Sequence, residues 1–139
     1  ILSNYIKKNS IWAVGKASNK EIDKINILQA SLLAMKRAIK KLRKKPTHIL
    51  IDGNKLPDLK KSKMKAIIKG DKKIPEISAA SIVAKVSRDR FIISLAKKNI
   101  GYFWHQNFGY GTKQHLEAIK YFGTTVHHRK SFSPIKNIK

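Results

Sequence analysis

Two aspartates stand where a carboxylate could bind a metal ion. Asp52 follows residues 48–51, an uninterrupted apolar stretch that is typical of a short buried strand. Residues 66–68 are a second apolar stretch, and we expect a second short strand there that ends in Lys69-Gly70-Asp71. Open α/β sheets bind ligands at the carboxyl ends of their strands, so the two carboxylates would converge if these strands are neighbours. Hard divalent cations such as Mg²⁺ and Mn²⁺ prefer such a cluster of oxygen ligands.

Each of these acids also has a purely structural interpretation. Residues 52–54 read Asp-Gly-Asn, a common turn sequence in which aspartate bonds its own backbone. A third carboxylate, Asp89, lies between two arginines, where a salt bridge on a helix surface is the simplest explanation. Because its helix begins soon after Asp71, a role near a metal ion stays open for Asp89.

The elements that would position these residues follow from hydrophobic spacing. Residues 11–15 are apolar and β-prone, so we expect a buried strand there. A capping box at residues 18–21 and apolar residues at alternating steps of three and four predict a helix from about 20 to 44. A second helix is expected from 78 to about 98. A short third helix is expected over Lys113–Phe122, with Thr112 as its N-cap and Gly123 as its C-cap glycine.

The order strand, helix, strand, strand, helix, helix indicates α/β architecture, with helices covering a sheet. We expect a single domain over residues 1–139, with a basic C-terminal segment at 124–139. Three short strands make a thin sheet, which suggests that its first strands are missing.

Aromatic residues and histidines gather in the C-terminal third. Residues 101–111 form an expected loop with five aromatic side chains, among them Tyr110, which could pack with its aromatic neighbours or contact a ligand. His127 and His128 are adjacent, and adjacent side chains rarely converge on one ion. Contact with phosphate, or packing over the sheet edge, is the expectation for this pair.

The composition favours a polyanionic partner. Lys and Arg total 31 against 8 Asp and Glu, so the net charge is +23, and such a surface attracts nucleic acid. The excess is mostly lysine in a chain rich in Ile and Asn, so a compositional bias on a solvated surface is the alternative. The absence of cysteine excludes disulfides and thiolate chemistry. No apolar run approaches the roughly 18 residues of a membrane helix, so we expect a cytoplasmic protein without a membrane partner.

Several segments together resemble bacterial ribonuclease HII. The string over residues 75–89, Pro-Glu-Ile-Ser-Ala-Ala-Ser-Ile-Val-Ala-Lys-Val-Ser-Arg-Asp, is highly specific, whereas Asp-Gly-Asn alone would not be. Gly111 stands where the family has proline in its Gly-Tyr-Pro-Thr segment. The other matching segments, in the family's order and spacing, are 26–28, 49–54, 69–71, 109–112, 115–116 and 128–132.

The resemblance implies a ribonuclease H-like fold, with a mixed sheet flanked by helices. It also implies an endonuclease that hydrolyses the RNA strand of RNA–DNA hybrids and cuts 5′ of single ribonucleotides in duplex DNA. The implied mechanism is two-metal-ion hydrolysis with Mn²⁺ or Mg²⁺, leaving 5′-phosphates, and the implied state is a monomer. Asp52 and Asp71 match two of four metal-binding carboxylates, and Asp89 matches an acidic position near the metals. Tyr110 matches the tyrosine that reads the ribonucleotide.

Basic residues near these positions could bind the phosphate backbone of the duplex. They are Lys69, Lys85, Arg88 and Arg129.

One family motif has no counterpart in the sequence. The other two carboxylates of the family lie in Asp-Glu-x-Gly-Arg-Gly, which is not found here, and neither is the Asp-Ser-Lys-Lys segment that follows it. We therefore expect an N-terminally truncated copy that binds duplexes through its charge but cleaves them weakly or not at all.

Two other functions are consistent with the sequence. A non-catalytic basic nucleic-acid-binding module would explain the charge and the aromatic loop. A structural RNA-associated protein of ribosomal type would explain the charge but not the carboxylates at strand ends. Replacing Asp52 distinguishes a nuclease, which loses metal, from a binding module, which is unharmed.

Overall fold

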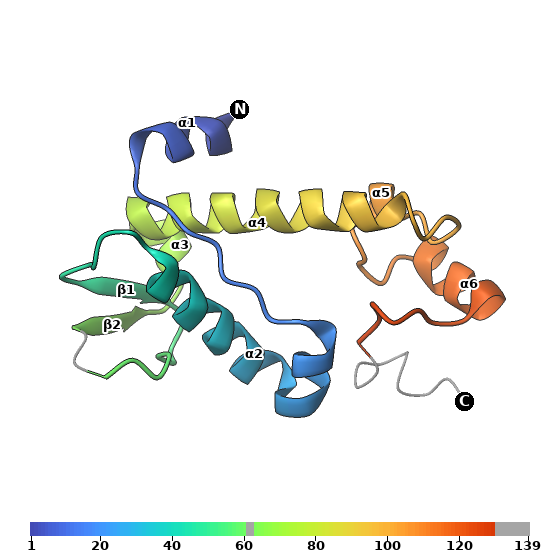
Figure 1. Ribbon diagram of the computed structural model, residues 1–139, viewed down its shortest axis with the longest axis horizontal. Helices are drawn as coiled ribbons and strands as arrows, with labels where there is room; N and C mark the ends of the chain where they lie inside the picture. The colour runs from blue at the N-terminus through green and yellow to red at the C-terminus, as the bar shows by residue number, and fades with distance from the viewer. Residues whose placement is uncertain (61–62, 130–139) are drawn as a thin grey trace.

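A long helix organises the molecule. The computed structural model describes residues 1–60 and 63–129. Figure 1 shows α4 lying along the long axis, with the strands and α3 near one end and α5 and α6 at the other. The elements in chain order are α1 (Leu2–Asn9), α2 (Asn19–Lys41), β1 (Ile49–Asp52), β2 (Met64–Ile67), α3 (Gly70–Lys73), α4 (Pro75–Ala96), α5 (Trp104–Asn107) and α6 (Lys113–Phe122).

The two strands are neighbours, as the metal-site hypothesis requires. β1 and β2 are parallel, and the register pairs Ile49 with Met64 and Asp52 with Ile67. β2 ends at Ile67, so the prediction that Asp71 ends this strand is wrong. Asp71 lies instead in the first turn of α3, a helix that the sequence analysis did not predict.

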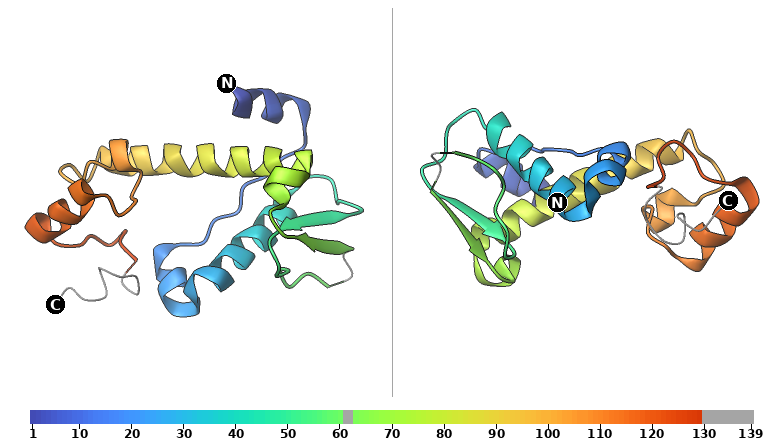
Figure 2. Two further views of the ribbon diagram at one scale, coloured as in Figure 1. Left: turned by 180° about the vertical axis from the view of Figure 1, so that it is seen from behind. Right: turned by 90° about the horizontal axis from the view of Figure 1, so that it is seen from below.

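The strand expected at residues 11–15 is wrong. Residues 11–18 form neither helix nor strand, and the segment runs alongside α2 (Figures 1 and 2). A Cβ atom on Gly15 would lie only 2.0 Å from the carbonyl oxygen of Ala34 and 2.4 Å from the backbone nitrogen of Ala38. Because Gly15 has no side chain, the backbone of this segment can pack directly on α2. The apolar pattern of residues 11–15 alone indicated a strand.

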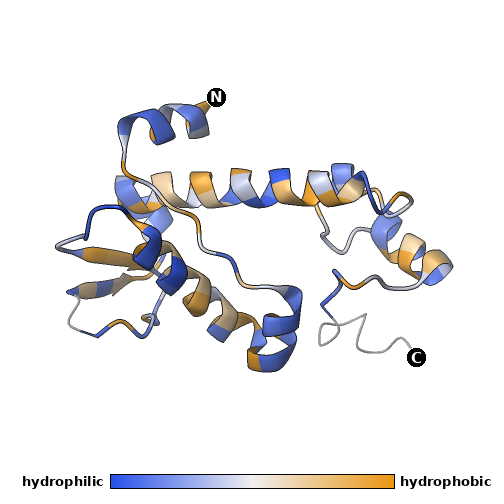
Figure 3. Ribbon diagram, in the orientation of Figure 1, coloured by the Kyte–Doolittle hydropathy of each residue, from blue (hydrophilic) through white to orange (hydrophobic). Residues whose placement is uncertain are grey.

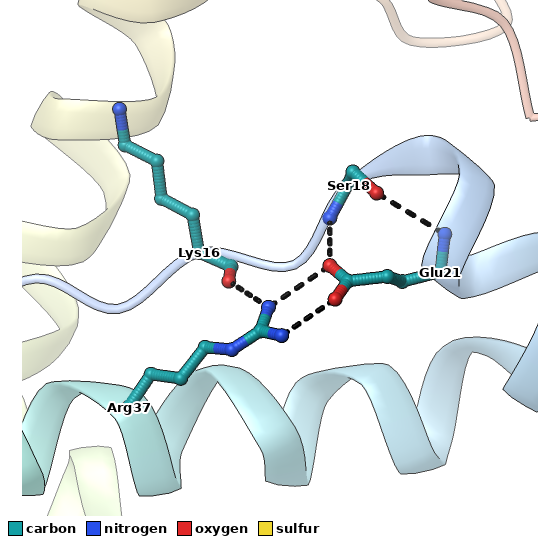
Figure 4. Close-up of polar contacts among 4 residues, drawn as sticks. All are labelled: Lys16, Ser18, Glu21 and Arg37. Atoms are coloured by element: carbon teal, nitrogen blue, oxygen red, sulfur yellow. Dashed lines mark hydrogen bonds and ion pairs between the residues drawn. The ribbon is translucent and has the colours of Figure 1, made fainter.

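The predicted capping box at the start of α2 is confirmed. Ser18 Oγ accepts from the Glu21 backbone N–H at 3.2 Å, and the Glu21 carboxylate accepts from the Ser18 N–H at 2.7 Å. Arg37 donates to both Glu21 oxygens, at 2.9 and 2.5 Å, and to the Lys16 carbonyl at 2.7 Å (Figure 4). These hydrogen bonds, with Arg37 contributing most, lower the pKa of Glu21 to about 2.

A break inside α2 brings Glu21 and Arg37 together, although the sequence predicted one continuous helix. Asn26 has φ 71° and ψ 170°, outside the helical region. Asparagine tolerates positive φ better than most residues, and its Oδ1 accepts from the Gln29 N–H at 3.0 Å. That hydrogen bond caps the second part of the helix. Because the helix is broken at Asn26, the first part, which carries Glu21, folds back toward Arg37.

The remaining predicted helices are confirmed with small shifts. α4 begins at Pro75, a favourable first helical residue because its missing N–H has no partner there in any helix. Thr112 Oγ1 caps α6 by accepting from the His115 N–H at 3.2 Å. Gly123, with φ 78°, follows the end of α6 as expected. The basic segment predicted at 124–139 is described only to residue 129.

The main buried cluster lies at the far end of α4 from the strands. Tyr102, Trp104, Ala118 and Ile119 form it, and partly buried apolar residues of α4 and α6 pack against it. Figure 3 shows apolar positions recurring along α4 and α6 between polar ones. The stacked rings of Tyr102 and Trp104 are 5.1 Å apart, so part of the expected aromatic loop is core.

Two further short helices, in addition to α3, were not expected from the sequence. α1 lies beside α4, and α5 is a single turn within the aromatic segment. Among the helices of residues 1–60 and 63–129, none is both long and apolar enough to cross a membrane.

Candidate active site

The carboxylate corner, which we define as Asp52, Lys69, Gly70 and Asp71, joins the end of β1 to the start of α3. The Gly70 N–H donates to Asp52 Oδ1 at 2.9 Å. Lys69 takes the left-handed conformation, with φ 53°, and turns the chain from β2 into α3. Both aspartates are exposed. The structure therefore brings Asp52 next to the turn that carries Asp71, although Asp71 itself lies in α3 and not at a strand end.

The corner leaves little room for a side chain at position 70. A Cβ atom there would lie 2.7 Å from Ile77 Cδ1, 3.4 Å from Ile67 Cβ and 3.6 Å from Asp52 Oδ1. The hydrogen bond to Gly70 is a structural role for Asp52, but it uses only one carboxylate oxygen. The other oxygen remains available as a ligand for a cation.

A second group, the Tyr–Arg group, consists of Arg88, Tyr110 and Arg129. The guanidinium carbon of Arg88 lies 4.8 Å from the centre of the Tyr110 ring, a cation–π distance. Tyr110 is 59% exposed, so its ring faces solvent over Arg88. Burial, and then the charge of Arg88, lower the pKa of Arg129, while Asp23 and Tyr110 act in the opposite direction. The two arginines therefore lie close enough to repel each other, which is an arrangement suited to an anion.

A pocket of about 670 Å³ lies beside the Tyr–Arg group. α2, α4 and α6 all contribute to its walls, together with the segment before α2 and residues 127–129. Arg88 and Arg129 lie on its polar side, and Ile27, Phe91 and Leu95 are among its apolar residues. The Nη1 atom of Arg88 is buried without a hydrogen bond, although it lies 3.6 Å from Asp89 Oδ1.

The structure does not bring all of the predicted site residues together. Pro75 adjoins the carboxylate corner, and the helical rise puts roughly 20 Å between Pro75 and Arg88. Asp89 is beside Arg88 on α4 and pairs with it, which is the structural interpretation of this acid. Within the described ranges, no three His, Asp or Glu side chains form a group that could hold a metal ion. Lys85 is exposed on α4 between the two groups.

The sequence analysis missed a buried histidine network under the Tyr110 loop. His128 is 6% exposed and lies against His115, with 3.2 Å between their Nε2 atoms. The expectation that His128 contacts phosphate or covers the sheet edge is therefore wrong. His115 also accepts from Trp104 Nε1–H at 3.0 Å. Both histidines lie in segments that resemble the family, 115–116 and 128–132. Nothing in the sequence indicated that their side chains are in contact.

The fold places the molecule in a known structural class. It is similar to the crystal structure of ribonuclease H2 from Pyrococcus horikoshii OT3, with a TM-score of 0.65 and 29% sequence identity. That similarity covers 87% of this chain and 64% of the other, so the chain spans less than two thirds of that protein. The class is that of α/β nucleases with the ribonuclease H-like fold, as the sequence predicted.

The sequence comparisons identify the family. The Ribonuclease HII family model matches residues 1–134. Ribonuclease HII of Pelagibacter ubique is 68% identical over 137 residues, which are 99% of this chain and 74% of that protein. Ribonuclease HII of Nitrosospira multiformis is 51% identical over 134 residues, which are 96% of this chain and 67% of that protein. The chain belongs to the ribonuclease HII family, whose members are divalent-metal-dependent nucleases.

Proposed function

We propose that this protein is an endonuclease that hydrolyses the RNA strand of RNA–DNA hybrids and cuts 5′ of single ribonucleotides in duplex DNA. One observation carries the proposal. In a chain of the ribonuclease HII family, Asp52 lies at the end of a parallel strand and binds the turn that presents Asp71. This is where open α/β folds assemble their sites.

The donors of the carboxylate corner fit Mg²⁺ or Mn²⁺. Asp52 and Asp71 are exposed carboxylates on adjoining elements, and both ions prefer oxygen ligands. Two carboxylates are few for a pair of ions, so further donors would be water, substrate phosphate or other acids. When bound, such ions lower the pKa of the attacking water and stabilise charge on the leaving 3′-oxygen. Lys69, in the same turn, would bind a neighbouring phosphate.

The Tyr–Arg group is proposed as a substrate-binding surface. Arg88 and Arg129 would bind backbone phosphate, and Tyr110 offers an exposed aromatic face to a sugar or base. Only the 2′-hydroxyl distinguishes RNA from DNA at a given nucleotide, so a residue that selects ribonucleotides must contact it. The separation of roughly 20 Å along α4 corresponds to about six base-pair steps of duplex. At this distance Tyr110 cannot contact the same nucleotide as the carboxylate corner. The role of Tyr110 in binding is therefore tested separately from the role of Asp52 in cleavage.

The proposal is tested by cleavage of a DNA duplex that carries one ribonucleotide, with Mn²⁺ present. The assay compares this chain alone with the chain joined to a family segment containing Asp-Glu-x-Gly-Arg-Gly. We expect the joined protein to cut 5′ of the ribonucleotide and leave a 5′-phosphate, and the chain alone to bind with little cutting. An all-DNA duplex is the control, and equal cutting of it would contradict the proposal.

A second candidate is a non-catalytic nucleic-acid-binding module. The net charge of +23 and the distance of the Tyr–Arg group from the carboxylate corner favour it. If both proteins bind the duplex and neither cuts it, this second function replaces the first. The remaining expectations, a monomer in the cytoplasm, stay predictions.

A further inference from the structure

Three rings and one backbone carbonyl form a hydrogen-bonded chain beneath the Tyr110 loop. Trp104 Nε1–H can only donate, so His115 Nε2 accepts from it at 3.0 Å. His115 must then carry its proton on Nδ1, which donates to the Tyr110 carbonyl at 2.8 Å. The Thr125 N–H donates to His128 Nδ1 at 2.8 Å, which leaves the His128 proton on Nε2, 3.2 Å from His115 Nε2. With both histidines neutral, His115 Nε2 is the acceptor in both of its contacts, and Trp104 Nε1–H at 3.0 Å and His128 Nε2–H at 3.2 Å share its single lone pair.

One end of this chain fixes the backbone of Tyr110. Its carbonyl accepts from His115 Nδ1–H and also from the Thr112 N–H at 2.9 Å. The preceding residues are held as well, because Asn107 Oδ1 accepts from the Gly109 N–H at 2.8 Å. The ring of Tyr110 is exposed, so its position over Arg88 depends on this backbone rather than on burial.

The other end fixes the backbone next to Arg129. His128 immediately precedes Arg129, and the His128 carbonyl accepts from Asn19 Nδ2 at 3.1 Å. Asn19 also donates to the Val126 carbonyl at 2.5 Å, which ties this segment to the first residue of α2. The histidine pair therefore connects two walls of the pocket, one carrying Tyr110 and the other carrying Arg129.

We propose that His115 and His128 are positioning residues, which set the distance between Tyr110 and Arg129 and so shape the duplex-binding surface. The inference rests on the proposed role of the Tyr–Arg group in binding substrate. Both histidines are almost fully buried, so we assign them to positioning and not to contact with the duplex.

The surroundings of His128 keep it neutral, as the network requires. Burial lowers its pKa to about 4, and the nearby His115 and His127 contribute in the same direction. The rings of Tyr102 and Trp104 also pack against His128, at 5.3 and 5.5 Å between centres.

Two substitutions of His115 separate the anchoring of Tyr110 from the support of the core. In His115→Asn, the side-chain amide reaches the position of Nδ1 and can donate to the Tyr110 carbonyl, but it cannot reach Trp104 or His128. In His115→Gln, the amide reaches the position of Nε2 and can accept from Trp104, but it cannot donate to Tyr110. The two variants therefore remove opposite ends of the network.

The first measurement is hydrogen exchange of the backbone amides of residues 109–112 in the full chain. We expect exchange to accelerate about tenfold in His115→Gln, the effect of losing roughly one hydrogen bond, and to change less in His115→Asn. Thermal unfolding should show the opposite order, with His115→Asn less stable because two buried groups lose their partner. Equal exchange in the two variants would overturn the proposal, whatever the protein does with a duplex.

The second measurement is the Kd for a DNA duplex carrying one ribonucleotide. We expect His115→Gln to weaken binding about tenfold, like Tyr110→Ala, since both lose one aromatic contact. In the double variant, His115→Gln should not weaken binding further than Tyr110→Ala alone. If binding instead follows stability, so that His115→Asn binds worse than His115→Gln, the histidines are merely structural and the proposal is overturned. If Tyr110→Ala itself binds like the parent, the proposed role of Tyr110 fails, and the exchange measurement alone decides whether His115 holds the loop.

Discussion

At the scale of single residues, Asp52 combines a structural and a proposed chemical role in one carboxylate. Its Oδ1 accepts from the Gly70 N–H, and this hydrogen bond alone would explain an aspartate at the end of β1. A structural role does not explain why Asp52 is exposed and lies close to the turn that carries Asp71. The two roles can be separated, because an asparagine keeps the acceptor oxygen and removes the charge.

His128 should make stability depend on pH in a defined window. Its pKa is about 4 in the folded protein and ordinarily 6.5, so between these values the unfolded chain binds more protons. The free energy of unfolding should therefore fall as pH decreases from 6.5 toward 4, and should be insensitive to this group above 6.5. The depressed pKa of Glu21 acts only below its ordinary value of 4.5, where stability is lost as pH falls toward about 2.

Urea unfolding between pH 4.5 and 7 measures the effect of His128 without that of Glu21. The slope of stability against pH should be smaller in His128→Asn than in the parent chain. A His48→Asn substitution, at an exposed histidine, is the control and should keep the slope of the parent. Equal slopes in the parent and His128→Asn would contradict the assignment of His128 as a buried neutral imidazole.

The site residues differed in how far the sequence could place them. Asp52 was predictable because the end of a strand is a local feature, whereas the position of Asp71 in the first turn of α3 was not predicted. The pairing of Arg88 with Tyr110 and the contact of His115 with His128 join segments that are distant in sequence. No local spacing encodes such contacts, since they depend on how α4, α5 and α6 pack.

At the scale of elements, Gly15 determines how residues 11–18 dock on α2. A Cβ atom there would overlap the α2 backbone at 2.0 and 2.4 Å, and a helix backbone cannot yield as a side chain does. Gly15→Ala should therefore lower the free energy of unfolding by about 2 kcal/mol or more. Gly111→Ala is the matched control, because its Cβ would meet nothing within 4 Å. Denaturant unfolding compares the two, and similar stability of both variants would show that the segment is not docked on α2.

The longer helices α2, α4 and α6 were predicted, whereas the shorter helices α1, α3 and α5 were not. Helix caps and apolar spacing can be recognised from short stretches of sequence. The caps predicted at Ser18 and Thr112 were both confirmed. The apolar run at 11–15 has the pattern of a buried strand, but its backbone packs on a helix instead. The break at Asn26 was not predicted because the apolar spacing continues through it, and the bonds that stabilise it, from the Gln29 N–H to Asn26 Oδ1 and from Arg37 to Glu21, are not visible in that spacing.

At the scale of the whole molecule, the net charge of +23 should dominate the affinity for duplexes. Binding that neutralises six to ten phosphates loses roughly 10³–10⁵ in affinity between 50 and 200 mM salt. We expect a steep linear fall of log affinity with log salt in fluorescence anisotropy. In Arg129→Met the slope should decrease by about one unit if this guanidinium binds a phosphate. A salt-independent affinity would contradict electrostatic binding.

The central claim, that the carboxylate corner binds the metal for cleavage, is tested most directly by Asp52→Asn. The rate measured is Mn²⁺-dependent cleavage of a duplex with one ribonucleotide, by the chain joined to the Asp-Glu-x-Gly-Arg-Gly segment. We predict a loss of more than about 100-fold for Asp52→Asn, because removing a metal ligand should cost at least as much as removing a group that only orients one. Asp58→Asn, at an exposed carboxylate in the loop after β1, should cleave at the parent rate. If Asp52→Asn folds and cuts as fast as the parent, the carboxylate corner is not the metal site.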